Sequence, residues 1–171
     1  MIASPQCSFR GTRHAGGAAA LLFLWLADPA VAAIDCSVSS AGVAFGQYDV
    51  THPGADDGTG TLRVTCSRQA GVDPSTVSYV LALGTGAGGS YVMRRMMSGT
   101  NLLNYNLFAN ASRTQVWGDG TSATVSVPGL ITFTGSQTSR STNHSIYGRV
   151  PAQQSVRSGS YNDTIVVTIT F

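Results

Sequence analysis

Short runs of β-branched and aromatic residues, separated by glycine, serine, asparagine and proline, recur through the chain after Ala33. No segment in this part of the sequence carries the 3.6-residue apolar stripe of an amphipathic helix. Because apolar side chains recur every second residue in a half-buried strand, this pattern predicts an all-β chain. The spacing of the runs favours a β-sandwich. The expected strands are 43–50, 60–66, 76–83, 103–108, 115–117, 130–134, 146–150 and 163–171.

The C-terminal segment 161–171 (YNDTIVVTITF) shows the cleanest alternation. One face carries Ile165, Val167, Ile169 and Phe171, and the other is mostly threonine. A strand that stops at an aromatic residue still needs partners for its backbone groups, either in its own sheet or in another molecule. This open requirement is the strongest functional indication in the sequence.

The N-terminal segment 1–33 has the features of a secretory signal peptide. Arg10 and Arg13 precede an apolar stretch, 18–27, that is too short to span a bilayer. Small residues follow, so we expect cleavage between Ala33 and Ile34, which leaves one exported domain, 34–171. A buried N-terminal helix is the alternative, but no later segment resembles a helical partner for it.

Removal of the signal also removes Cys7 and leaves one pair of cysteines, Cys36 and Cys66. In an oxidising compartment such a pair most simply forms a disulfide. Closing a loop of about 30 residues would contribute on the order of 3 to 4 kcal/mol. A lipid anchor on Cys36 is disfavoured because Asp35, a charged residue, precedes it.

The charge composition excludes several function classes. Every basic residue is Arg and every acidic residue is Asp, with no Lys or Glu in the chain. The net charge of +2 is spread out without a basic tract, so nucleic acid is not an expected partner. The lack of Lys also excludes Schiff-base chemistry. The glycine-rich run 84–89 lacks the Lys that completes a phosphate-binding P-loop.

No catalytic or metal-binding motif stands out. After residue 33 the only imidazoles are His52 and His144, and both are expected to be exposed. In the sequence WGDG at 117–120, Asp119 is expected to cap its own turn rather than to bind Ca²⁺ or sugar, and Trp117 to fill the core. We expect no enzyme activity, metal, cofactor or small-molecule substrate. The methionines of YVMRRMM, 91–97, are expected to fill an irregular part of the core.

The order of several segments resembles the spore coat protein U domain family, whose fold is used by subunits of archaic (Csu-type) chaperone-usher pili. Together the matching segments cover nearly everything from Cys36 to Phe171. They are VAFGQYDV (43–50), GTLRVTCS (60–67), YVLALGTG (79–86), RRM (94–96), LNYNLFANASRTQVWGDG (103–120) and YGRVPAQQSVRSGSYNDTIVVTITF (147–171).

The resemblance implies an incomplete immunoglobulin-like β-sandwich that lacks its final strand. A periplasmic chaperone would supply that strand until a neighbouring pilus subunit replaces it, with assembly through an outer-membrane usher. The accepting groove and chaperone contact would include Ile165, Val167, Ile169 and Phe171. The family-motif residues, expected to be structural, are Trp117, Gly118, Asp119, Gly120, Tyr147, Gly148 and Arg149.

The resemblance also bears on where the protein acts. Cleavage after Ala33 leaves only Ile34 and Asp35 ahead of the first cysteine, too little for a donor strand. We therefore expect a tip or terminating subunit of a surface pilus used for adhesion and biofilm formation, which passes through the periplasm to the cell surface. A secreted spore-coat or matrix protein is one alternative, and a monomeric carbohydrate-binding module is another.

Overall fold

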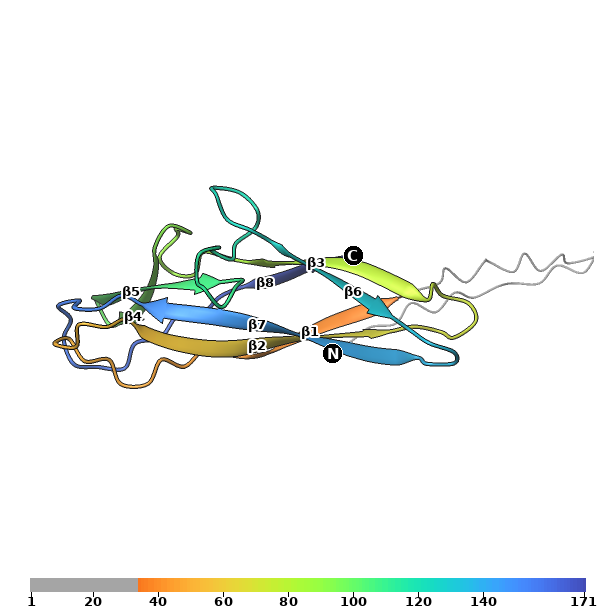
Figure 1. The fold of residues 1–171 in the computed structure, drawn as a ribbon, viewed down its shortest axis with the longest axis horizontal. Helices are drawn as coiled ribbons and strands as arrows, with labels where there is room; N and C mark the ends of the chain where they lie inside the picture. Colours follow the sequence, from red (N-terminus) through yellow and green to blue (C-terminus); the bar gives the residue numbers. More distant parts are fainter. Residues whose placement is uncertain (1–33) are drawn as a thin grey trace, which may run out of the picture. The chain divides into compact units, whose positions relative to one another are not determined.

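The computed structural model describes residues 34–171, so the expected signal peptide and its cleavage after Ala33 lie outside the described residues. Eight antiparallel strands form two sheets in this part of the chain (Figure 1). No helix there is long and apolar enough to cross a membrane. The five-stranded sheet has the order β1 (Asp35–Ala41), β2 (Asp56–Ser67), β7 (Ser139–Val150), β5 (Asn101–Phe108) and β4 (Arg94–Ser98). The three-stranded sheet has the order β6 (Val127–Thr132), β3 (Thr76–Leu83) and β8 (Val167–Thr170).

The core lies between the two sheets and follows directly from strand alternation. In β2 every second residue is buried, including Leu62, Val64 and Cys66. In β3 the same alternation buries Val77, Tyr79, Leu81 and Leu83. Trp117, from the loop after β5, is completely buried between these layers. The expected sandwich of all-β character is therefore confirmed for the described residues.

Several strand boundaries differ from the expected ones. Segment 43–50 belongs to no strand, and Val116 and Trp117 form only isolated bridges, with Phe108 and Val125. The C-terminal strand covers only Val167–Thr170 of the expected 163–171. The alternation of these segments reflects side-chain packing on the core, which does not require a hydrogen-bonded partner strand.

Three elements escaped sequence analysis. β1 is rich in serine, the first part of β7 is Ser139 to Ser145, and β4 begins with two arginines. Of the three methionines in segment 91–97 only Met96 is buried, whereas Met93 and Met97 are 42% and 40% exposed. The expectation that all three fill the core is therefore wrong.

A disulfide joins Cys36 and Cys66, as expected from the cysteine pair. The two cysteines are directly opposed in the register of β1 and β2. The bond therefore fixes β1, an edge strand, to its neighbour β2. This fixed edge forms one side of the site described next.

Candidate strand-accepting groove

Four strands lie at sheet edges in the described part of the chain, and β1 and β8 are two of them. β1 pairs with β2 alone, and β8 pairs with β3 alone. Gly84 N–H donates to Val166 C=O at 2.8 Å, which defines the hydrogen-bonded pairs of the β3–β8 ladder. Because hydrogen-bonding groups alternate sides along an antiparallel strand, the N–H groups of Val167 and Ile169 face the open edge. Each open edge therefore offers unsatisfied backbone groups.

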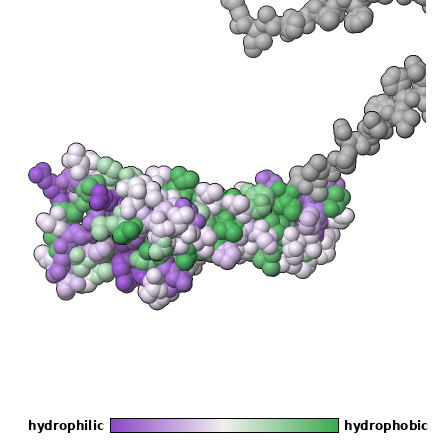
Figure 2. All heavy atoms as spheres, turned by 90° about the horizontal axis from the view of Figure 1, so that it is seen from above, coloured by the Kyte–Doolittle hydropathy of each residue, from purple (hydrophilic) through white to green (hydrophobic). Residues whose placement is uncertain are grey.

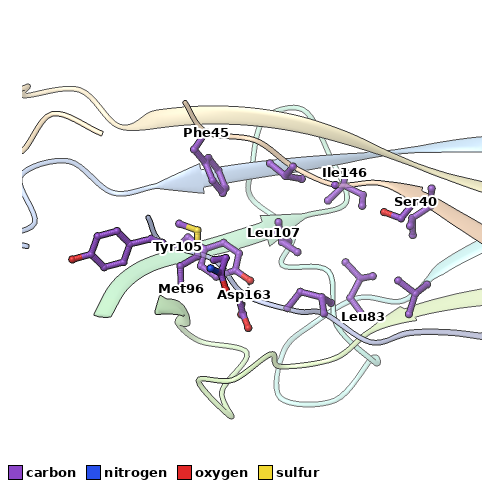
Figure 3. Close-up of a pocket in the computed structure, with 15 residues that line it drawn as sticks. Ser40, Phe45, Leu83, Met96, Tyr105, Leu107, Ile146 and Asp163 are labelled. Atoms are coloured by element: carbon purple, nitrogen blue, oxygen red, sulfur yellow. Dashed lines mark hydrogen bonds between the residues drawn. The ribbon is translucent and has the colours of Figure 1, made fainter. Parts of the chain in front are cut away.

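A cavity of about 290 Å³, here called the first cavity, lies beside the open edge of β8 (Figure 3). Its lining comes from both sheets and from the chain after β1. The buried part is apolar and includes Leu62, Leu83, Leu107 and Ile146. Figure 3 shows Phe45, Ile146 and Leu83 arranged around this space. Ile165 and Val167 complete the side that adjoins β8.

A second cavity of about 1100 Å³ adjoins the first. It lies between segment 43–50 and segment 156–161, with Leu103 and Val150 also in its lining. Four residues line both cavities and so stand at their boundary: Val43, Phe45, Met96 and Tyr161. The two cavities together form a groove from Ser40 and Val167 at one end to Val50 and Arg157 at the other. We call this the accepting groove.

One wall of the accepting groove rests on glycines. A Cβ on Gly58 would come within 2.9 Å of Val43, and one on Gly148 would come within 2.6 Å of the Phe45 ring. Gly60 is equally close to the chain at Ala41 and Val43. These glycines occupy inward positions of β2 and β7, so segment 41–45 lies directly on the large sheet where the small sheet does not reach. Sequence analysis missed this wall, although glycines at inward strand positions signal a close backbone approach.

Asp163 anchors the opposite wall. The Tyr105 hydroxyl donates to Asp163 Oδ2 at 2.7 Å, and the Ala87 and Thr164 N–H groups donate to Oδ1 at 2.9 and 2.8 Å. Burial and the neighbouring carboxylate raise the pKa of Tyr105 well above its ordinary value, so its proton stays in this hydrogen bond. Asp163 thereby ties the chain ahead of β8 to the Gly84–Gly89 loop and to β5. Its carboxylate is fully used within the protein.

A buried cation supports the same region. Arg94 is completely buried and donates to the carbonyls of Gly84 and Trp117, at 2.8 and 2.7 Å, and to Asn106 Oδ1 at 2.7 Å. Burial lowers the pKa of Arg94, although a guanidinium remains protonated at neutral pH. The side chain thus joins the ends of β3 and β5 behind the first cavity. Sequence analysis gave Arg94 no role, because an arginine at an inward strand position is usually disfavoured.

The predicted groove residues fall in different places. Ile165 and Val167 line the first cavity. Ile169 is half-buried against the core but lines neither cavity, and Phe171 is 58% exposed. Figure 2, which views the molecule from the side of β3 and β8, shows several separate apolar patches on this surface. Val166, on the outer face beside β8, is 68% exposed.

The motif residues of the segment 117–120 (WGDG) make contacts within the fold. Trp117 is fully buried and its Nε1–H donates to Leu81 C=O at 3.1 Å, so the ring is not available to stack on a sugar. Asp119 Oδ1 accepts from Thr121 N–H at 2.9 Å and from the Thr121 hydroxyl at 2.7 Å, and these bonds lower the Asp119 pKa. The expected Asx turn and core tryptophan are confirmed. Gly118 packs against Thr124 and Gly120 has a φ of +89°, as the turn requires.

The remaining motif residues lie on β7: Tyr147, Gly148 and Arg149. Gly148 faces inward beneath Phe45, and Arg149 faces outward. Arg149 donates two hydrogen bonds to Asp57, at 2.7 and 2.8 Å, which lower the Asp57 pKa and raise that of Arg149. Arg113 lies 3.2 Å from the same carboxylate and its guanidinium sits over the Tyr147 ring. The ion pairs of Asp57 with Arg113 and Arg149 link β2 to β7 on the face away from the groove.

Neither histidine forms part of a catalytic arrangement. His52 is in an exposed turn, as expected. His144 is half-buried, and its Nε2 shares a 2.8 Å hydrogen bond with the Tyr79 hydroxyl across the two sheets, so the expectation of exposure is wrong for it. Its inward side in β7 explains the difference. Within residues 34–171 no three His, Cys, Asp or Glu side chains gather to hold a metal.

Comparisons with known proteins agree with this architecture. The Spore Coat Protein U domain matches residues 22–168. Protein U of Myxococcus xanthus is 34% identical over 153 residues, which cover 80% of this chain and 77% of that protein.

The fold is also similar to a crystal structure of the CsuC-CsuE chaperone-tip adhesion subunit pre-assembly complex, from archaic chaperone-usher Csu pili of Acinetobacter baumannii. The TM-score is 0.52 and the identity 21%, over 81% of this chain and 40% of that chain. This chain thus spans less than half of that neighbour's length, and the likeness concerns the fold. The match over most of the sequence shows that the chain belongs to the Spore Coat Protein U domain family.

Proposed function

We propose that this protein is an exported structural subunit of a chaperone-usher surface pilus that accepts a strand from a partner. One observation carries the proposal: the open edges of β1 and β8 border a groove whose floor is the apolar core. An inserted strand would satisfy the open backbone groups of β8 and place alternate side chains in the groove. Burying the partly exposed Ile165 and Val167 would add to the stability of the complex.

The partners follow from this role. A periplasmic chaperone supplies the strand in transit, a neighbouring subunit replaces it, and an outer-membrane usher exports the product to the cell surface. The fold is similar to that of a chaperone complex with a tip adhesion subunit, which supports both the chaperone and a tip or terminating position. Adhesion and biofilm formation are the expected roles of such a pilus.

A secreted spore-coat or matrix protein is the second candidate. The family name and the identity to Protein U of Myxococcus xanthus favour it. In that case the domain would work without an usher. A carbohydrate-binding module has less support, because the tryptophan of its expected stacking platform, Trp117, is completely buried.

The test is co-expression of the full precursor with the chaperone encoded nearest to it, followed by size-exclusion chromatography and intact mass of the periplasmic fraction. We expect a one-to-one complex, and aggregation or loss of the subunit when the chaperone is omitted. A stable monomer that ignores the chaperone would contradict the pilus role and favour the coat or matrix protein. Fusing a donor segment from a shaft subunit ahead of Cys36 tests the terminating position, since the fusion should then polymerise.

A further inference from the structure

We propose that Pro128 and Arg140 close the free edge of β6 to strand addition, which leaves the edge of β8 to the incoming strand. The two residues are then specificity determinants of a strand-accepting subunit. This inference rests on the proposed function, because it concerns which strand edge a partner can use. The occupant that they exclude is β6 of a second copy of this chain.

The edge strands differ in how far the chain itself covers them. Along β4, Met97 and Asn162 exchange two backbone hydrogen bonds, at 2.8 and 3.1 Å. Gly88 also lies against this strand, since an added Cβ there would come within 3.1 Å of the Arg95 backbone nitrogen. In contrast, β6 pairs with β3 on one side, and no other strand of residues 34–171 pairs with it. The edge of β6 therefore needs protection of another kind.

The hydrogen-bonding pattern between β3 and β6 decides which backbone groups face this edge. Phe133 N–H donates to Ser75 C=O at 2.7 Å, so these two residues form a hydrogen-bonded pair. Hydrogen-bonded and non-hydrogen-bonded pairs alternate along an antiparallel ladder. The backbone groups that point to the free edge are therefore those of Pro128, Leu130 and Thr132.

A different residue blocks each end of this edge. Pro128 has no N–H, so the edge lacks a donor at that position. At the other end the Arg140 guanidinium donates to Thr132 C=O at 2.9 Å and occupies this acceptor. Arg140 comes from β7 of the opposite sheet, so a charged side chain lies across the edge. Proline and charged side chains both protect free strand edges from pairing with other chains.

Of the three residues that face the edge, Leu130 alone keeps both its N–H and its C=O free of these two blocks. A strand that adds to an antiparallel edge bonds to every second residue, about 7 Å apart. At β6 it would complete one pair, whereas β8 offers intact groups at both Val167 and Ile169. No residue of β6 lines the accepting groove. An incoming strand therefore gains more hydrogen bonds and more apolar contact at β8.

Pairing of β6 with β6 of a second copy shows why both residues are needed. Two antiparallel strands related by a twofold axis through Leu130 place Pro128 of one copy opposite Thr132 of the other. The hydrogen bond at that position would run from the N–H of residue 128 to the Thr132 carbonyl. Proline removes its donor and Arg140 occupies its acceptor. Both residues therefore act against the same bond, once at each end of the pairing.

The test restores the edge of β6 and measures self-association. Pro128→Val supplies the missing N–H, and Arg140→Ser frees the Thr132 carbonyl. Both changes are made together in the full precursor, which is co-expressed with the chaperone encoded nearest to it. The mass of the soluble exported species, chaperone complex or free subunit, is then measured by size-exclusion chromatography with light scattering over a concentration series.

We expect the mass of the double variant to rise with concentration to about double that of the wild-type species, which should stay constant. Two changes combined in one control variant match the altered side chains. Ser78→Val adds a valine to the same outer face, on β3 opposite Leu130, and adds no N–H to the free edge. Arg63→Ser removes an equal charge from the exposed face of β2. This control should keep the wild-type mass.

A reversal variant shows whether the association uses the edge of β6. Leu130→Pro removes the central N–H of that edge but spares the ladder with β3, because the Leu130 N–H points away from β3. Added to the double variant, it should return the mass to the wild-type value. If the double variant is recovered only as an aggregate, Leu130→Pro should return it to the soluble fraction.

The outcomes separate this inference from the proposed function. A double variant that keeps the wild-type mass at every concentration, a control that associates equally, or association that survives Leu130→Pro would overturn the role of Pro128 and Arg140. None of these results bears on whether the groove accepts a strand. A wild-type monomer that ignores the chaperone would instead contradict the proposed function, and the variant masses would still test the edge of β6.

Discussion

At the scale of single residues, Arg94 is the side chain whose role differs most from its type. A fully buried guanidinium normally carries a large desolvation cost, which here is offset by four hydrogen bonds to three acceptors. Arg94→Met would leave the Gly84 and Trp117 carbonyls without their Arg94 donors, whereas Asn106 Oδ1 would keep its bond from Leu107 N–H. We expect it to lower the free energy of unfolding by about 3 to 5 kcal/mol. Urea unfolding of the exported protein, followed by Trp117 fluorescence, measures this.

The next residue along the chain provides the control for Arg94. Arg95 has the same side chain but points outward from β4 and is exposed. Arg95→Met should change the unfolding free energy by no more than about 0.5 kcal/mol. Equal effects of the two substitutions would show that the buried hydrogen bonds contribute little.

The burial of His144 makes stability depend on pH. Burial lowers the pKa of His144 below its ordinary value of 6.5, so the unfolded chain takes up this proton at a higher pH than the folded chain does. The contribution of His144 is therefore complete above pH 6.5 and is lost as the pH falls towards the folded value. We expect His144→Gln to flatten this part of the pH–stability profile, measured by urea unfolding between pH 7.5 and 5. His52→Gln, in an exposed turn, is the matched control and should retain the wild-type slope.

At the scale of elements, alternate residues of β8 direct their backbone N–H groups to opposite edges of the strand. The N–H groups of Thr168 and Thr170 face β3, whereas those of Val167 and Ile169 face the open edge. Because proline lacks an N–H, Ile169→Pro should spare the β3 ladder but hinder an incoming strand. We expect much less chaperone complex with Ile169→Pro than with Ile169→Ala, which controls for the lost side chain. Equal recovery would mean that the edge of β8 is not used.

Alternation identified the strands that carry the core, because β2, β3 and β5 bury one face against the other sheet. Alternation did not predict the strands correctly where a segment packs on the core without a partner strand, or has a partner strand but few large apolar residues. Segment 43–50 alternates since Val43 and Phe45 rest on glycines, yet it has no partner strand among the described residues. Conversely, β1 has a partner strand but few large apolar residues, so its pattern is weak.

The accepting groove was harder to predict than the fold, since its walls come from segments far apart in the sequence. Alternation placed Ile165 and Val167 on one face, and the family resemblance implied that this face lines a groove; both residues line the first cavity. The other side depends on the approach of segment 41–45 to Gly148, a contact across about a hundred residues that no local pattern records. Ile169 and Phe171 alternate in step with Val167 and so belong to the same face of the strand. The alternation does not specify where along the strand the cavity ends.

At the scale of the whole molecule, the absence of Lys has a direct experimental use. The α-amino group of the mature chain is its only primary amine, because all ten basic residues other than histidine are Arg. An amine-reactive N-hydroxysuccinimide ester at neutral pH should therefore add one label per exported molecule. If cleavage follows Ala33, the label will lie on a peptide that begins with Ile34, as peptide mass spectrometry can determine. A start as early as Asp28 would still leave only a short segment with Pro29 and few large apolar residues ahead of Cys36. A label on a peptide that begins ahead of Asp28 would leave room for a donor segment and would contradict a terminating position.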